Sequence, residues 1–218
     1  MIRTLPKIRV LDLKIIFDPS ISNLKFQILI NNSRTYRMPL EMRGIFFIVF
    51  LSLQAFCIFT NMKIQFWSIG KQHEDYVKPG IEDFSRRISK YFPVQWYIIP
   101  SPKNAGLLKE TDLKNREASR ILELLHREDY LITLDERGKS LNSEGLAAFL
   151  QARANESCRQ LIFLIGGAFG LDETLLKRSN YIWSLSELTF PHQLVRLLLA
   201  EQVYRACTII RNEKYHHS

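Results

Sequence analysis

The feature that most constrains the fold is an alternation of short apolar runs with longer helical patterns after residue 62. Five runs are typical of buried strands: 63–70, 94–100, 130–135, 160–167 and 181–186. Five longer stretches between and after them are typical of helices: 82–92, 113–126, 144–154, 171–179 and 194–210. Apolar strands separated by helices indicate a mainly parallel sheet with helices on its faces. The sequence therefore predicts an α/β fold.

Ligands of such sheets bind beyond the carboxyl ends of the strands. The segments that follow the five strand runs, several of them rich in glycine or charge, are 70–71, 101–106, 135–139, 166–170 and 187–193. We therefore expect the functional site to be built from these segments.

A glycine cluster, LIGGAFG, follows the fourth strand run. Gly166 and Gly167 end the run, and Gly170 precedes the next helix. Glycines let a backbone approach a ligand closely, which suits a nucleotide-like cofactor. The spacing is not that of the dinucleotide-binding fingerprint. A tight turn without a ligand is the alternative interpretation.

The fifth strand run leads into a polar loop and then a long helix that opens with Pro191 and His192. Proline near a first helical turn is ordinary punctuation. His192 and Arg196 could serve a site at the strand ends, or they could be a helix cap and a solvated side chain. The tail after this helix carries Tyr215 and His216. An aromatic ring among basic residues suits RNA, and a frayed polar terminus is the alternative.

Charge and cysteine content bound the remaining possibilities. The chain has a formal net charge of +8, and five of these charges fall within the first 61 residues. RNA binding by the nearly neutral remainder therefore cannot rest on net charge. Cys57, Cys158 and Cys207 are widely spaced. Unpaired cysteines suit a reducing cytoplasm, and each is expected to be packed as a small hydrophobic residue. Their spacing is not that of metal ligands, so no metal is predicted.

Residues 1–61 read as an N-terminal extension without recognisable chemistry. Two β-prone runs, 10–17 and 24–30, precede an uncharged stretch whose most membrane-like part is 45–60. A spanning helix needs about 17 to 25 such residues. Three interpretations stay open: a membrane anchor, a late signal-like segment, or upstream sequence that is not part of the natural protein. We favour the third interpretation and do not expect membrane association.

Residues 62–218 resemble the ribosomal RNA large-subunit methyltransferase H family of the SPOUT superfamily. The resemblance lies in the opening MKIQFWSIGK, in LITLDERGKS, FLIGGAFG and WSLSELTFPHQLVRLLLAEQVYRA, and in the closing YH, all in the family's order. None of it covers residues 1–61. It implies a SPOUT-type parallel sheet with a deep trefoil knot near the C-terminus, an exception to unknotted topology.

The resemblance also implies S-adenosylmethionine as the cofactor, held at three of the strand ends described above. The implied cofactor-binding residues are Leu134, Gly167, Ser186, Glu187, Leu188, Thr189, Phe190 and Pro191. Members of the family act as homodimers that methylate N3 of a pseudouridine in 23S rRNA on the assembled ribosome. The tail of one subunit completes the site of the other.

We assign catalytic roles on this basis. His192 is the expected base and Arg196 and Arg205 the expected charge stabilisers, while Tyr215 and His216 would act from the partner subunit. Two other functions stay open: a SPOUT methyltransferase acting on another RNA such as transfer RNA, and an RNA-binding module without catalysis.

Overall fold

The computed structural model describes residues 13–15, 27–30, 34–37 and 62–215. The chain divides into two units, residues 1–54 and 55–218. In the first unit, β1 (Leu13–Ile15), β2 (Gln27–Ile30) and β3 (Arg34–Arg37) form an antiparallel sheet in the order β1-β2-β3. β1 and β2 fall within the two predicted β-prone runs. The apolar stretch 45–60 lies outside the described residues. Within the part that is described, no helix has the length and apolarity needed to cross a membrane.

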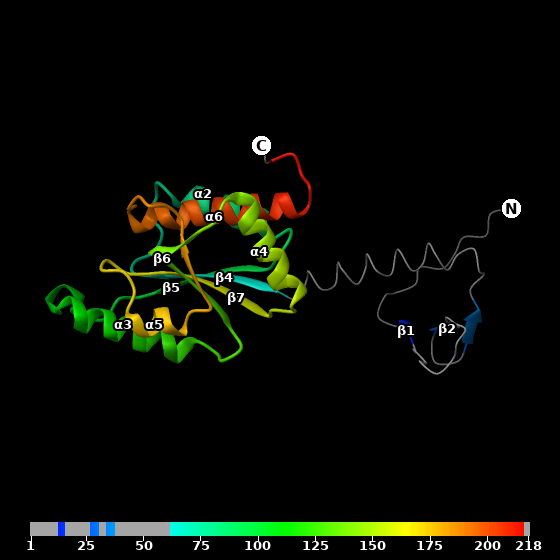
Figure 1. The fold of residues 1–218 in the computed structure, drawn as a ribbon, viewed down its shortest axis with the longest axis horizontal. Coiled ribbons are helices and arrows are strands. Elements are labelled where there is room, and N and C mark those ends of the chain that lie inside the picture. The colour runs from blue at the N-terminus through cyan, green and yellow to red at the C-terminus, as the bar shows by residue number, and fades with distance from the viewer. Residues whose placement is uncertain (1–12, 16–26, 31–33, 38–61, 216–218) are drawn as a thin grey trace. The chain divides into compact units, whose positions relative to one another are not determined.

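The second unit is built on a sheet of five parallel strands (Figure 1). The strands lie in the order β5-β4-β7-β6-β8. Their bounds are β4 (Lys63–Ile69), β5 (Val94–Ile99), β6 (Tyr130–Ser140), β7 (Gln160–Ile165) and β8 (Tyr181–Ser184). The five predicted strand runs and the parallel sheet are confirmed.

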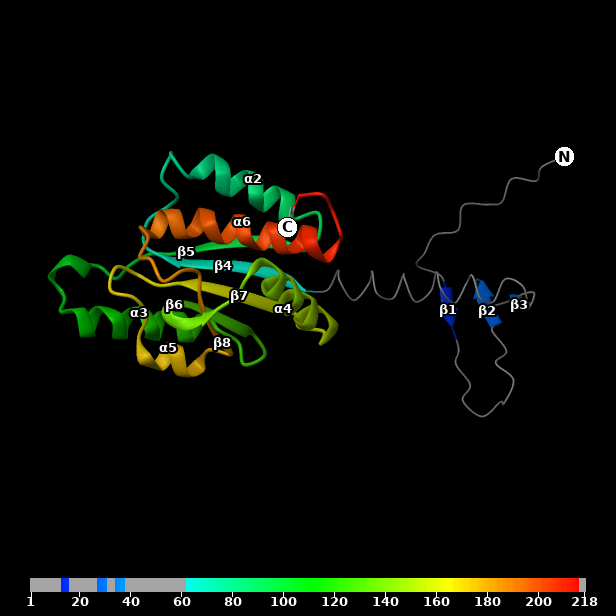
Figure 2. The same cartoon turned by 45° about the horizontal axis from the view of Figure 1, so that its top comes forward.

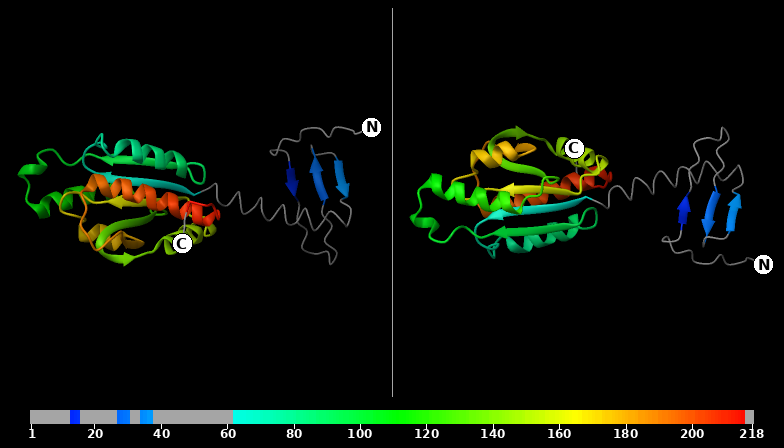
Figure 3. Two further views of the ribbon diagram at one scale, coloured as in Figure 1. Left: turned by 90° about the horizontal axis from the view of Figure 1, so that it is seen from above. Right: turned by 90° about the horizontal axis from the view of Figure 1, so that it is seen from below.

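Helices cover both faces of this sheet. Their bounds are α2 (Lys78–Ile88), α3 (Glu110–Leu124), α4 (Ser143–Asn155), α5 (Glu173–Arg178) and α6 (His192–Ile210). α2, α4 and α6 lie on one face, and α3 and α5 lie on the other (Figures 1 and 2). α6 runs beside α2, as the view from above in Figure 3 also shows. The predicted α/β layers are therefore confirmed.

Two hydrophobic cores explain why the strand runs carry apolar residues on both faces. Phe66 and Phe163 belong to the core under α2, α4 and α6. Trp67 and Leu164, their chain neighbours, belong to the core under α3 and α5. Successive side chains of a strand point to opposite faces, so strands of a sheet that is covered on both faces are apolar at most positions rather than at every second one.

β6 is longer than the run 130–135 predicts. Leu134 and Lys139 both pair with Trp183 of β8, so the ladder resumes after an irregularity. At this crossing a Cβ on Gly138 would lie 2.7 Å from the Ile182 carbonyl oxygen. A glycine is therefore required where β6 meets β8, although charge in this segment argues against a strand. The trefoil knot stays a prediction.

The starts of two helices follow from their sequence. α2 begins four residues earlier than predicted, with Pro79 in its first turn, where proline is well tolerated. α4 begins after Asn142, whose side chain accepts a hydrogen bond from the Gly145 amide at 2.8 Å. The proline of α2 and the Asn142 cap of α4 therefore mark where these two helices begin.

Candidate active site

The ends of three adjacent strands bring the predicted cofactor residues to one place. Leu134 of β6 pairs with Ile165 of β7 and with Trp183 of β8. Gly167 follows two residues after Ile165, and Ser186 follows three residues after Trp183. Neighbouring strands lie about 4.8 Å apart. Leu134, Gly167 and the loop that begins at Ser186 therefore lie side by side at the carboxyl edge of the sheet.

The glycine cluster after β7 forms a tight turn. The Gly170 amide donates to the Gly167 carbonyl oxygen at 3.0 Å, and Gly170 adopts a φ of +79°. A Cβ on Gly166 would lie 3.1 Å from the Gly170 carbonyl carbon. Phe169, at the tip, is 51% exposed. The turn is thus confirmed, with bare backbone and an uncovered aromatic ring at the site edge.

The loop between β8 and α6 is tethered at its start and open beyond it. The Ser184 hydroxyl donates to the Ser186 carbonyl oxygen at 3.0 Å, and the Leu188 amide donates to the Ser186 hydroxyl at 2.9 Å. Leu188 is 70% exposed, and its neighbours Glu187 and Thr189 are also exposed. A tethered loop that presents an apolar side chain suits a flat, partly apolar ligand.

Arg196 is almost fully buried, with 1% of its surface exposed. Its Nε donates to the Ser68 hydroxyl at 2.9 Å, and its Nη1 donates to the Lys71 carbonyl oxygen at 2.9 Å. Its Nη2 donates to the Ile69 carbonyl oxygen at 3.4 Å. Burial lowers the pKa of this guanidinium. Arg196 therefore joins α6 to the end of β4, and its charge-stabilising role in the reaction stays a prediction.

The first turn of α6 holds the loop after β4 and carries His192. Gln193 Nε2 donates to the Gln72 carbonyl oxygen at 3.1 Å, and Gln193 Oε1 accepts from the Glu74 amide at 3.3 Å. Desolvation, and then the charge of Arg196, lower the pKa of His192. The imidazole is therefore neutral near pH 7, as a proton acceptor must be.

The other end of α6 carries a second set of predicted residues. Arg205 Nε donates to Glu201 Oε1 at 3.0 Å, and the Tyr215 hydroxyl donates to the same oxygen at 3.3 Å. The Arg205 guanidinium lies 5.1 Å from the centre of the Tyr215 ring, and the Tyr204 and Tyr215 ring centres are 4.7 Å apart. Tyr215 is thus packed against the helix. His216 lies outside the described residues.

The predicted catalytic residues form two sets that are well separated within one chain. His192 and Arg205 are thirteen residues apart on α6, or about 20 Å along a helix that rises 1.5 Å per residue. His192 and Arg196 lie at the carboxyl edge of the sheet, whereas Arg205 and Tyr215 lie toward the opposite edge. One chain does not bring the two sets together.

Glu117 of α3 belongs to the site edge but was missed by the sequence reasoning. It is 6% exposed, and a Cβ on Gly167 would lie 2.7 Å from its Oε2. Leu113 and Ile121, four residues to either side, are buried on the same stripe of the helix. An acidic residue at an apolar position of a helical stripe was the signal that could have identified it.

The two cysteines that the structure describes are packed in the protein. Cys207 is buried and Cys158 is half-buried, and burial raises the pKa of both thiols, in line with packing roles. Cys57 lies outside the described residues. Where the structure is described, no group of three or more His, Cys, Asp or Glu side chains is placed to hold a metal.

The parallel α/β sheet carries a glycine turn and a tethered, exposed loop at the carboxyl edge, where ligands of such sheets bind. Residues 62–216 match the family described as predicted SPOUT methyltransferase. The chain belongs to this family of methyltransferases, and within it to that of ribosomal RNA large subunit methyltransferase H.

The sequences of two bacterial relatives align with this chain over all or nearly all of their own length. The chain is 44% identical over 156 residues to ribosomal RNA large subunit methyltransferase H of Cytophaga hutchinsonii. The alignment covers 72% of this chain and 100% of that protein. It is 42% identical over 156 residues to the protein of the same name from Flavobacterium johnsoniae, with 72% and 99% covered. A probable methyltransferase from Bordetella pertussis Tohama I superposes with a TM-score of 0.42 at 12% identity, covering 71% of this chain and 99% of that one. That structural likeness is too weak to add to the assignment.

Proposed function

We propose that this chain is a homodimeric, cytoplasmic enzyme that transfers a methyl group from S-adenosylmethionine to N3 of a pseudouridine in 23S rRNA of the assembled ribosome. The observation that carries the proposal is the match to relatives named ribosomal RNA large subunit methyltransferase H, whose entire length is covered. The matched region, residues 62–216, contains every strand end from which the candidate site is built.

The cofactor edge fits S-adenosylmethionine. Phe169 and Leu188 are apolar side chains left 51% and 70% exposed on the two loops that would flank the cofactor. An adenine ring has two apolar faces that such side chains can cover. At Gly166 and Gly167 the Leu171 and Glu117 side chains lie where a Cβ would stand, so glycine lets this turn pack tightly beside the cofactor edge. When bound, the cofactor supplies an electrophilic methyl group on a sulfonium sulfur.

The chain's own residues must position the nucleobase and remove its N3 proton. N3 of pseudouridine is a weak acid, and it becomes nucleophilic as that proton leaves. The bound cofactor would supply the methyl group that N3 takes up, and the proton that leaves N3 would pass to a residue of the chain. His192 is the acceptor that we assign, because it lies beside the cofactor loop at the start of α6 and its pKa is lowered. Arg196 holds the neighbouring loop after β4 in place.

The separation of the two residue sets supports a site shared between subunits. Arg205 lies about 20 Å along α6 from His192, beyond the reach of one substrate base, and the Tyr215 ring lies beside the Arg205 guanidinium. A second copy related by twofold symmetry can place its own Arg205 and Tyr215 beside His192 of the first. The aromatic ring of Tyr215 would then stack on the target RNA.

Methyl transfer to ribosomes tests the proposed function. The full chain, and a shortened chain that begins at Met62, are incubated with labelled S-adenosylmethionine and ribosomes that lack the modification. We expect the label on N3 of a 23S rRNA pseudouridine, located by mass spectrometry, with both proteins. Label on transfer RNA alone would overturn the ribosomal substrate, and folded dimers that transfer no label to any RNA would overturn the enzymatic role.

Mixing two variants tests the shared site. His192→Ala and Tyr215→Ala should each be nearly inactive in methyl transfer. Heterodimers of the two contain one site with both native residues, so random mixing should restore about one quarter of the wild-type rate. Recovery no greater than the average of the two parents would show that both residues act within the same subunit.

A further inference from the structure

Glu117 is a carboxylate buried where the cofactor edge meets α3. Only 6% of the residue is exposed. Burial raises the pKa of the carboxyl group, and a hydrogen bond from Ser101 partly offsets this effect. Within the described residues, no basic side chain contributes to the pKa shift of Glu117. Burying a carboxylate without a cation is costly, and structural ion pairs normally meet that cost.

The carboxylate lies directly against the glycine turn of the site. A Cβ built on Gly167 would lie 2.7 Å from Glu117 Oε2 and 3.1 Å from Oε1. Gly167 is one of the residues that we assign to the cofactor. The absence of a side chain there leaves the carboxylate in contact with the backbone that would hold the ligand.

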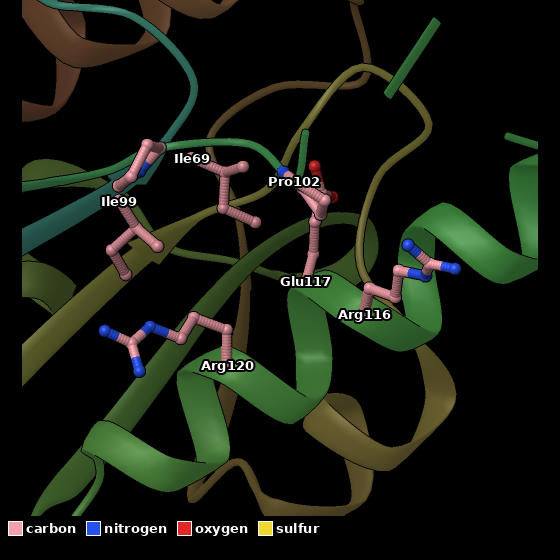
Figure 4. Close-up of a pocket in the computed structure, with 7 residues that line it drawn as sticks. Ile69, Ile99, Pro102, Arg116, Glu117 and Arg120 are labelled. Carbon is pink, nitrogen blue, oxygen red and sulfur yellow. The ribbon is translucent and has the colours of Figure 1, made fainter. Parts of the chain in front are cut away.

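Glu117 also lines a cavity between α3 and the carboxyl ends of β4 and β5. The cavity has a volume of about 300 Å³ and is lined by Ile69, Ile99, Pro100, Pro102, Arg116, Glu117 and Arg120. Figure 4 shows the Glu117 carboxylate pointing toward Pro102, while the guanidinium groups of Arg116 and Arg120 point away from it to either side. The arginines therefore leave the carboxylate free to meet a ligand, and the remaining walls are apolar.

The space suits the small cationic end of a ligand. A cavity of about 300 Å³ is at the lower limit for whole small-molecule sites, so it holds one portion of a cofactor rather than all of it. A buried carboxylate beside apolar side chains, with the Arg116 and Arg120 guanidinium groups directed away from it, selects a compact cation that donates several hydrogen bonds. A primary ammonium group meets both requirements.

We propose that the Glu117 carboxylate binds the α-ammonium group of the amino-acid portion of S-adenosylmethionine. The inference rests on the proposed use of this cofactor. It assigns the adenosine portion to the loops after β6, β7 and β8, and the amino-acid portion to the α3 side of the glycine turn.

Calorimetric binding to the full chain tests the contact without methyl transfer. Three ligands are used: S-adenosylmethionine, S-adenosylhomocysteine and 5′-methylthioadenosine, the last of which lacks the amino-acid portion. Glu117→Gln should weaken the first two by at least about 10-fold and leave the third unchanged, because it removes one partner of a desolvated charge pair. Glu110→Gln, an exposed carboxylate at the start of the same helix, should change none of the three.

The pattern of losses decides between the contact and a purely structural role. Equal weakening of all three ligands would show that Glu117 only supports the turn, and no weakening would show no contact; both results overturn the inference and leave the proposed function standing. Failure of the wild-type chain to bind any of the three would overturn the cofactor assignment itself.

A change on the ligand keeps the test valid if Glu117→Gln does not fold. An S-adenosylhomocysteine analogue with hydrogen in place of the α-amino group should bind the wild-type chain at least about 10-fold more weakly than the parent ligand. Equal affinities for the two would overturn the inference.

Discussion

Replacing Arg196 with methionine removes a buried guanidinium and keeps a long side chain. Three acceptors at the end of β4 then lose their donors: the Ser68 hydroxyl and the carbonyl oxygens of Ile69 and Lys71. Each buried acceptor left without a donor costs about 1–3 kcal/mol, and part of this is offset because a charge no longer has to be desolvated. We expect a net loss of about 3 kcal/mol in the free energy of unfolding.

Thermal unfolding of the full chain measures this loss. For a domain of this size, 1 kcal/mol shifts Tm by about 2–4 °C, so Arg196→Met should lower Tm by about 6–12 °C. Arg86→Met is the matched control, because the Arg86 side chain is 77% exposed and pairs with Asp83 at the surface. It should lower stability by less than about 1 kcal/mol. Equal Tm values for Arg196→Met and the wild type would refute the supporting role of this side chain.

Three further predictions concern the site. Gly167→Ala places a methyl group 2.7 Å from Glu117 Oε2, so it should destabilise the chain by about 1–3 kcal/mol in thermal unfolding and weaken cofactor binding, whereas Gly106→Ala, with open space around it, should do neither. His192→Ala should slow single-turnover methyl transfer by about 100-fold. Because the pKa of His192 is lowered, the wild-type rate should fall with acid with its midpoint below pH 6.5 as the base is protonated, and a midpoint above this pH would contradict the assignment. Tyr215→Ala should lower ribosome methylation by about 10-fold or more and spare cofactor affinity measured by calorimetry, and lost cofactor affinity would contradict its assignment to RNA.

Strand positions could be predicted because burial on both faces leaves a direct trace in the sequence. Residues 161–165 of β7 are apolar without interruption, and all five are buried. The second part of β6 leaves no such trace. Glu136, Arg137 and Lys139 are charged, and this segment pairs with β8 across an irregularity that neither strand's composition encodes. The requirement for glycine at position 138 is visible only once β8 is in place.

The cofactor edge could be predicted because parallel strands place their carboxyl ends together, so residues far apart in the chain become neighbours. Leu134, Gly167 and Ser186 are such a set. The environment of a charged side chain could not be predicted in the same way. Arg196 lies in an apolar run of α6 and Glu117 in a polar run of α3, yet both are buried because both positions face the interior of the protein. Helix packing, rather than residue type, decides which charges are buried.

α6 fixes the separation of two residues that we assign to the reaction. A rigid helix fixes the distance between its residues, so His192 and Arg205 cannot approach each other by any rearrangement of loops. Arg205 is also held by Glu201, and Tyr215 is held by the same carboxylate. Arg205 and Tyr215 are therefore held in place by contacts within their own chain. A preorganised patch of this kind loses little conformational entropy on binding, so it would cost little to dock it onto the second subunit that we propose.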